Sequence, residues 1–375
     1  MESNLRVLMI LDSFLVGGTE THVFTLTREL LKQGVHVVVL GDDGPLHQLF
    51  LELGCPVYVL DFDQENRAQI NSDLNQIVNN EGINLIHAHQ TGCAPFAISL
   101  AKDKGIPFLF SVHGSYYKIS TLADMAEQAA FISVSPAIQN WLWKHRIPSI
   151  LIPNGIDTDY YRLQPIDVNL CREYGIPTNV PIVVYAGRLS WEKADIAEEV
   201  IQACAYLRER EGFPNLHLLI VGDGWHSDGI RALATRRNEL AGTDFIHLAG
   251  SMRDVRPFYA LGDCVVGTGR VALEAMSCKR PVVAVGSRGF FGLVTPDVYI
   301  KAWYYYFGDH KRLYARSSDM LANEIKNTIL SSERARRSWG TQGRRFVKYF
   351  FDIRSVTVDL LHLYKLLYNK SGSAR

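Results

Sequence analysis

The chain has 375 residues, too many for one ordinary hydrophobic core, so we expect two domains. A hydrophobic content of 47% with 21% charged residues excludes a disordered chain, and no run of eighteen apolar residues suggests a membrane-spanning helix. Of the 39 basic and 39 acidic residues, 10 and 17 fall in residues 1–165, which leaves the rest of the chain basic. A basic second part suits the binding of an anion such as a nucleotide phosphate; scattered surface charge is the alternative.

The first residues contain Glu2 and lead into a short apolar strand, without the long apolar segment of a signal peptide, so we expect a cytoplasmic protein. Six cysteines are scattered without paired spacing. We interpret them as reduced core residues rather than a disulfide framework or a zinc site.

Short apolar runs alternate with amphipathic stretches through the first half of the chain. Residues 19–34 predict a helix, because Val23, Leu26, Leu30 and Leu31 share one face and Gly34 follows. The alternation predicts a parallel sheet with helices on both faces. The expected strands are 5–11, 36–41, 57–62, 84–89, 107–114, 129–135 and 149–155.

The pattern restarts after residue 165, with expected strands at 181–187, 216–224, 244–250, 263–267 and 280–286. We therefore predict an α/β fold of two doubly wound parallel-sheet domains that face each other across a cleft. The predicted domains are 1–165 and 166–351, and a final amphipathic helix, 352–371, packs back on the first domain. Ligands of such sheets bind at the carboxyl ends of the strands, where the informative residues gather.

Two candidate sites follow strands of the first domain. Gly17 and Gly18 precede a helix, where glycines let backbone N–H groups approach a phosphate; a plain tight turn is the alternative. His113 ends another strand and has the chemistry to bind a sugar hydroxyl or stabilise charge, although an isolated histidine is commonly structural.

Arg188 and Lys193 follow the first strand of the second domain. Two cations at one strand end repel each other unless an anion lies between them, and a diphosphate fits that need. The small residues of 221–224 and 248–252, with Gly222 and Met252 among them, permit close contact with a flat base.

A further donor-site candidate is the stretch 265–276, a strand end, a turn with Gly267 and Gly269, and a helix that carries Glu274. A carboxylate accepts hydrogen bonds from both hydroxyls of a ribose. The pairs Asp61/Asp63 and His87/His89 resemble metal ligands, but neither has a third ligand nearby in the sequence, so we predict no metal.

Together these motifs resemble those of the retaining glycosyltransferases of family 4, which have the GT-B architecture. The resemblance rests on residues 17–22, 112–114, 152–157, 186–193, 221–224 and 273–284. It implies a nucleotide-sugar donor held by the second domain, an acceptor held by the first, and a transfer that retains anomeric configuration without a metal. We expect no cofactor besides that donor.

The resemblance also implies roles for single residues. Arg188 and Lys193 neutralise the donor phosphates, Glu274 holds the ribose, Gly17 and Gly18 approach the diphosphate, and His113 lies beside the transferred sugar. We expect His113, Arg188 and Lys193 to act in catalysis. The other expected donor contacts are Gly222, Met252, Gly267, Thr268, Gly269, Arg270 and Val271.

The chain departs from the family pattern in two places. The family has a second glutamate eight residues before Glu274, and this chain has Val266 there. Two hypotheses follow: Thr268 or Arg270 replaces the missing contact, or the donor lacks a hydroxyl at that point. The family pattern also leaves unexplained Arg288 and the aromatic cluster 303–307, which we interpret as packing in the core or at the domain junction.

The leading hypothesis is a metal-independent glycosyltransferase that uses a UDP-sugar and a small-molecule acceptor. The alternatives are a catalytically degenerate partner of an active glycosyltransferase and a nucleotide-sugar epimerase. The acidic first part disfavours contact with anionic membranes and suits a cationic acceptor, such as an amino sugar. We expect no nucleic-acid partner.

Overall fold

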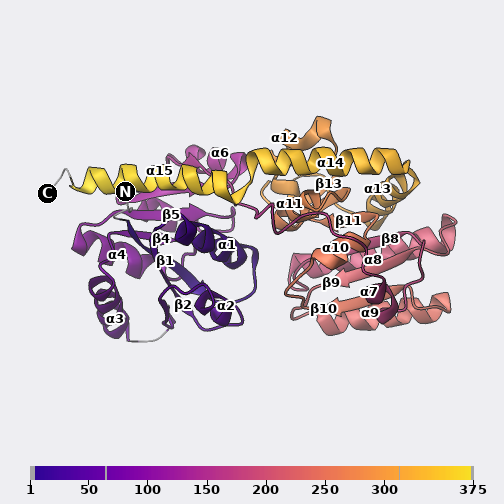
Figure 1. Ribbon diagram of the computed structural model, residues 1–375, viewed down its shortest axis with the longest axis horizontal. Coiled ribbons are helices and arrows are strands. Elements are labelled where there is room, and N and C mark those ends of the chain that lie inside the picture. Colours follow the sequence, from indigo (N-terminus) through magenta and orange to yellow (C-terminus); the bar gives the residue numbers. More distant parts are fainter. Residues whose placement is uncertain (1–4, 64–65, 312, 373–375) are drawn as a thin grey trace. The chain divides into compact units, whose positions relative to one another are not determined.

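The computed structural model describes residues 5–63, 66–311 and 313–372. The chain divides into two compact units. Unit 1 is Met1–Asp157 together with Phe350–Arg375, and unit 2 is Thr158–Tyr349. The two divisions therefore fall after residues 157 and 349, against 165 and 351 in the sequence-based boundaries. Figure 1 shows both units as strands flanked by helices.

Unit 1 is built on a seven-stranded parallel sheet with the strand order β3-β2-β1-β4-β5-β6-β7. Each strand coincides with one of the seven runs expected from the sequence, so the predicted parallel sheet is confirmed. The strands are β1 (Arg6–Ser13), β2 (His36–Asp42), β3 (Val57–Val59), β4 (Leu85–Ala88), β5 (Phe108–Val112), β6 (Ala129–Ser133) and β7 (Ile150–Leu151).

Helices cover both faces of this sheet because its buried strand residues alternate between two apolar clusters. Leu8 and Ile10 pack with α3, α4 and α6, whereas Val7 and Met9 pack with α1 and α15. The C-terminal helix thus completes one face of unit 1. The helices are α1 (Gly18–Lys32), α2 (His47–Leu51), α3 (Arg67–Asn80), α4 (Ala94–Lys104), α5 (Ile119–Met125), α6 (Pro136–Lys144) and α15 (Ile353–Gly372).

Unit 2 has a six-stranded sheet with the order β10-β9-β8-β11-β12-β13. The five expected strands are present and parallel, but the sixth strand, β13, runs antiparallel to β12, so the sheet is mixed. The strands are β8 (Ile182–Ala186), β9 (His217–Val221), β10 (Ile246–Gly250), β11 (Cys264–Gly267), β12 (Val282–Gly286) and β13 (Gly289–Leu293).

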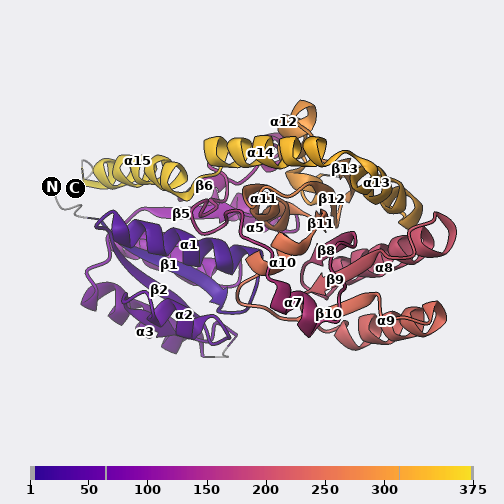
Figure 2. The same cartoon turned by 45° about the vertical axis from the view of Figure 1, so that its right-hand side comes forward.

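One face of the unit 2 sheet packs on α8, α9 and α13, and α13 lies against α8 (Figure 2). The α-helices of unit 2 are α7 (Val168–Glu173), α8 (Glu192–Arg210), α9 (Ser227–Ala241), α10 (Arg256–Leu261), α11 (Gly269–Ser277), α12 (Tyr299–Tyr304), α13 (Ser318–Leu330) and α14 (Glu333–Phe350), with 3₁₀ turns at Pro296–Val298 and Tyr306–Gly308. In the described part of the chain, no helix has both the length and the apolar character that crossing a membrane requires.

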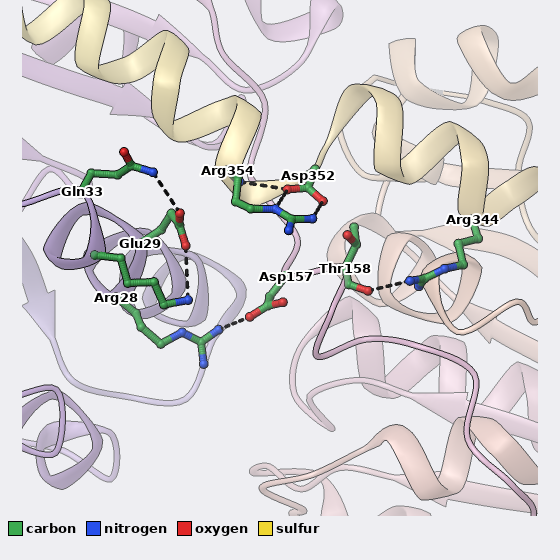
Figure 3. Close-up of polar contacts among 9 residues, drawn as sticks. Arg28, Glu29, Gln33, Asp157, Thr158, Arg344, Asp352 and Arg354 are labelled. Atoms are coloured by element: carbon green, nitrogen blue, oxygen red, sulfur yellow. Dashed lines mark hydrogen bonds and ion pairs between the residues drawn. The ribbon is translucent and has the colours of Figure 1, made fainter.

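The chain passes between the units twice, and each side of the first passage is held within its own unit (Figure 3). In unit 1, Asp157 pairs with Arg28 of α1, and Ile156 exchanges backbone hydrogen bonds with the segment just before α15. In unit 2, the Arg344 guanidinium donates to the carbonyls of Thr158 at 2.9 Å and Tyr161 at 2.8 Å. These contacts hold Asp157 in unit 1 and Thr158 in unit 2, so only a short stretch of backbone connects the two units here.

Candidate functional site

The strand order of unit 2 reverses between β8 and β11, the place where open α/β sheets bind ligands beyond the carboxyl ends of their strands. The chain leaves β8 through Gly187 and Arg188, and it leaves β11 through Thr268 into α11. Most of the expected donor residues therefore follow these two adjacent strands or their neighbours.

Glycines bring the backbones after β8, β9 and β10 close together. The Gly187 N–H donates to the Val221 carbonyl at 3.0 Å, and the Gly222 N–H donates to the Gly250 carbonyl at 2.8 Å. Gly222 has a φ of +145°, and a Cβ on it would lie 1.9 Å from the Gly187 oxygen. Close approach of these backbones therefore requires a glycine at residue 222. Met252, expected to contact the base, follows two residues after β10 and is half-buried.

Arg188 and Lys193 both belong to the connection from β8 to α8. The Arg188 guanidinium lies 5.7 Å from the centre of the Trp191 ring, and Lys193 lies in the first turn of α8. The structure thus brings the two predicted cations to one strand end of one unit.

Lys193 has a carboxylate neighbour that the sequence did not reveal. Its Nζ lies 3.5 Å from Asp309 Oδ2, while Asp309 Oδ1 accepts from the Ser287 N–H at 3.0 Å and the Ser287 hydroxyl at 3.1 Å. Burial alone would raise the pKa of Asp309, but the Lys193 ammonium and the Ser287 N–H hold it below its ordinary value. Asp309 is therefore ionised at neutral pH.

The glycines of the β11–α11 turn are required by packing inside unit 2. A Cβ on Gly267 would lie 2.5 Å from the Val271 side chain, and Gly269 has a φ of +51° with the Tyr306 ring beside it. The Thr268 hydroxyl donates to the Phe307 carbonyl at 2.9 Å. Donor contacts from these residues stay predictions.

Glu274 is buried in a polar cluster of its own unit. Arg270 Nε lies 2.7 Å from Glu274 Oε1, an ion pair by distance, although the N–H is not aligned as a hydrogen bond. The Tyr259 hydroxyl donates to Oε2 at 3.2 Å, and Tyr161 also bonds this carboxyl. Burial raises the pKa of Glu274, and Arg270 offsets part of the rise. Binding of a ribose here, as predicted, requires one of these contacts to be exchanged.

Val266, where the family pattern has a glutamate, is a core residue of β11. Its side chain is 0% exposed in an apolar cluster with Val183 and Val283 of the neighbouring strands. An unpaired carboxylate at this place would carry the full cost of burying a charge in apolar surroundings. β11 therefore offers no carboxylate at this position to the predicted donor site.

The expected residues of unit 1 lie at its carboxyl edge, around the reversal between β1 and β4. Gly17 is the N-cap of α1, and a Cβ on Gly18 would meet nothing within 4 Å. Packing in unit 1 therefore does not require a glycine at residue 18.

His113 is buried in a cluster of histidines. Its Nε2 lies 3.1 Å from His89 Nδ1, and His22 and His87 complete the group. His87 Nδ1 contacts the Tyr364 hydroxyl at 2.7 Å, and burial, with the nearby His113, lowers the pKa of His87 to about 3. His87 is therefore neutral at physiological pH, and the sequence-based view of an isolated His113 is replaced by a packed group.

The acidic pair Asp61/Asp63 forms a local turn, with the Asp63 N–H donating to Asp61 Oδ1 at 2.8 Å. Over residues 5–63, 66–311 and 313–372, no group of three or more histidine, cysteine or carboxylate side chains is arranged to hold a metal ion.

Solved structures that align with this chain include a glycosyltransferase and a protein solved with UDP. A glycosyltransferase from Rickettsia africae aligns with a TM-score of 0.78 at 18% identity, over 97% of this chain and 99% of that one. The Anabaena protein Alr3699/HepE, solved with UDP and glucose, aligns with a TM-score of 0.75 at 19% identity, over 96% and 100%. The two Rossmann-like units of this chain have the GT-B architecture.

The sequence matches two family models, "Glycosyltransferase Family 4" over residues 16–160 and "Glycosyl transferases group 1" over residues 169–346. The chain belongs to the family 4 glycosyltransferases. It is 24% identical to the alpha-maltose-1-phosphate synthase of Mycolicibacterium smegmatis, over 96% of this chain and 99% of that protein. It is 28% identical to one component of the phosphatidylinositol N-acetylglucosaminyltransferase of Arabidopsis thaliana, over 78% of this chain and 66% of that component.

Proposed function

We propose that this protein transfers a sugar from a UDP-sugar to a hydroxyl of a small-molecule acceptor, with retention of configuration and without a metal. The observation that carries the proposal is the pair Arg188 and Lys193 at the strand reversal of unit 2. Two cations at one strand end form a suitable receptor for a diphosphate.

The charge change of the reaction gives Arg188 and Lys193 their role. When the bond between the sugar and the diphosphate breaks, negative charge develops on the phosphate and positive character on the sugar. Cations fixed in advance beside that phosphate stabilise the transition state without a metal. The acceptor hydroxyl then attacks from the face of the leaving group, and a donor phosphate oxygen takes its proton.

Uridine as the base is supported by the Anabaena protein solved with UDP. In this chain a flat base would lie against the backbone around Gly222 and near Met252.

A small-molecule acceptor is supported by a hollow of about 570 Å³ in unit 1. Its lining includes Phe62, which follows β3, and Gly92 and Phe96 at the start of α4. Asp63 and Arg67 add one charge of each sign, so an acceptor that carries an amino group could pair with Asp63.

The test is a calorimetric screen of nucleotides and nucleotide sugars, with the anomeric configuration of any product read by NMR. We expect UDP and one UDP-sugar to bind, turnover to persist in EDTA, and Lys193→Met to weaken both ligands about tenfold or more. If no nucleotide or nucleotide sugar binds, the proposal is wrong.

The internal pairing of Glu274 favours a second candidate function, a non-catalytic partner of an active glycosyltransferase. A carboxylate already satisfied by Arg270 and two tyrosines is less available to a ribose. This candidate predicts no turnover with any donor and a stable complex with a second glycosyltransferase on purification.

A further inference from the structure

Asp309 lies at the carboxyl edge of unit 2, on the segment that follows α12. Ser287 holds one of its oxygens through two hydrogen bonds, at 3.0 and 3.1 Å, and the other oxygen lies 3.5 Å from Lys193 Nζ. The Asp309 side chain is 17% exposed and that of Lys193 is 40% exposed. Ser287 thus fixes one carboxylate oxygen of Asp309, while the other oxygen faces Lys193, whose side chain is partly exposed to solvent.

The backbone that carries Asp309 is held in an unfavourable conformation. Tyr306, Phe307 and Gly308 have φ values of +47°, +56° and +105° in succession. For a bulky residue such a conformation costs about 1–3 kcal/mol and persists only where the surroundings impose it. Here Thr268 donates to the Phe307 carbonyl at 2.9 Å and the Arg288 N–H donates to the Gly308 carbonyl at 3.0 Å. The turn is fastened to the strand ends on which the candidate donor site lies.

We propose that Asp309 determines the choice of donor sugar by accepting a hydrogen bond from a hydroxyl of the sugar being transferred. This inference rests on the proposed function, in which Lys193 binds the donor diphosphate. The Asp309 carboxylate beside that lysine does not bind the donor phosphate itself, because the two groups are both anions and repel each other. The sugar is joined directly to the terminal phosphate, and its hydroxyls are the nearest groups that can donate to Asp309.

The proposal defines the class of donor sugar. Asp309 favours a neutral sugar with a free hydroxyl next to the site, and it repels a sugar that places a carboxylate there. Val266 lies in the apolar core, so Asp309 supplies from a distant segment the carboxylate that β11 does not carry.

A purely structural role makes a different prediction. If Asp309 only orients Lys193, its loss weakens the binding of UDP and of the UDP-sugar equally, because both present the same diphosphate. If Asp309 contacts the sugar, its loss weakens the binding of the UDP-sugar but not that of UDP. UDP is then bound unchanged or more tightly, since Lys193 loses a competing partner.

The experiment measures the affinities of UDP and of a UDP-sugar by calorimetry for wild type, Asp309→Asn and Asp309→Ala. UDP-glucose is the first probe, replaced by whichever UDP-sugar binds best in the screen above. Asparagine keeps the size of the side chain and an acceptor for Ser287. The matched control is Asp297→Asn, an exposed aspartate of the same unit whose carboxylate accepts from Thr295. Unfolding of each ligand-free variant is followed to confirm its fold.

We expect Asp309→Asn to lower the affinity for the UDP-sugar by about 10- to 100-fold and to change the affinity for UDP by less than about threefold. A donor analogue in which fluorine replaces the contacted hydroxyl should bind wild type and Asp309→Asn alike. Equal losses for UDP and the UDP-sugar, an unchanged UDP-sugar affinity, or lost turnover with intact binding would each overturn the proposal. Wild type that binds neither ligand would instead refute the proposed function, before any Asp309 variant is considered.

Discussion

Two carboxylates of unit 2 each pair with a cation, and the two pairs differ in their access to solvent. The side chains of Glu274 and Arg270 are 7% and 9% exposed, so that pair is closed inside the unit. The pair of Asp309 and Lys193 is open on one side. A closed pair is costly to break because it leaves a buried charge, whereas an open pair exchanges readily with a ligand.

The closed pair makes a prediction that separates stability from binding. Arg270→Met should lower the free energy of unfolding by about 3–5 kcal/mol, because the Glu274 carboxylate stays buried without its cation. Adding Glu274→Gln should restore most of that loss, since the amide is neutral and still accepts from Tyr259 and Tyr161. Chemical denaturation measures both changes; a double variant less stable than the single one would contradict this account.

The same double variant also tests the predicted ribose contact, because its fold is expected to be almost as stable as that of wild type. If Glu274 holds the ribose or Arg270 contacts the donor, as both are predicted to, the double variant should bind UDP about tenfold more weakly than wild type while it unfolds almost normally. Unchanged UDP affinity would place the ribose elsewhere.

Sequence reasoning reached Glu274 and Lys193 but not their partners, for two different reasons. Arg270 and Glu274 are spaced i,i+4 on one helix, a pattern that predicts an ion pair and was available in the sequence. Asp309 is 116 residues from Lys193, and no local pattern connects them. Only the course of the chain over the sheet edge brings that pair together.

The connections at the carboxyl edge of unit 2 depend on glycines that the neighbouring backbone leaves no room to replace. Gly222→Ala adds a Cβ that would lie 1.9 Å from the Gly187 carbonyl, at a φ of +145° that side chains rarely adopt. We expect a loss of about 3 kcal/mol or more in unfolding free energy and weaker UDP binding, because Arg188 follows the displaced Gly187.

Gly229→Ala is the matched control for that substitution. Gly229 lies in the first turn of α9, and a Cβ there would meet nothing within 4 Å. Its unfolding free energy should be unchanged or slightly higher, since alanine favours a helix more than glycine does. Similar losses of unfolding free energy for both variants would mean that the close approach of Gly222 to Gly187 does not determine the stability of unit 2.

At the scale of elements the sequence predicted every parallel strand but missed β13. Parallel strands read as apolar runs followed by helical periodicity, which is a strong local signal. β13 is a short partner of β12 in a hairpin, and two of its five residues, Gly289 and Gly292, are glycines with positive φ. Its pairing is decided by contacts with β12 and with Tyr314. The unexplained aromatic cluster lies just beyond it, with Tyr306 and Phe307 buried in the turn before Asp309.

Across the whole molecule both units bury histidines that resist protonation. Burial lowers the pKa of His87 in unit 1 to about 3 and that of His217 in unit 2 to about 4. The neighbouring His113 lowers the pKa of His87 further, and His247 and Arg208 do the same for His217. In the unfolded chain a histidine has a pKa near 6.5, so between about pH 6.5 and 4 the unfolded state binds protons that the folded state does not.

The protein should therefore lose stability as the pH falls through that window. Each such histidine contributes a slope of about 1.4 kcal/mol per pH unit. Unfolding free energies measured from pH 7 to 4.5 should fall, and His87→Gln should reduce the slope. A stability that is flat over this range would contradict the prediction.

Unit 2 is one continuous stretch of chain, whereas the core of unit 1 includes Val356, Leu360 and Tyr364 of α15. During synthesis on the ribosome, the order of completion is therefore the reverse of the order in the sequence. Unit 2 has its whole sequence once residue 349 emerges, while the earlier-made unit 1 still lacks α15, which packs with α1 on one face of its sheet. The nascent unit 1 must keep that apolar surface from other partners until α15 leaves the exit tunnel.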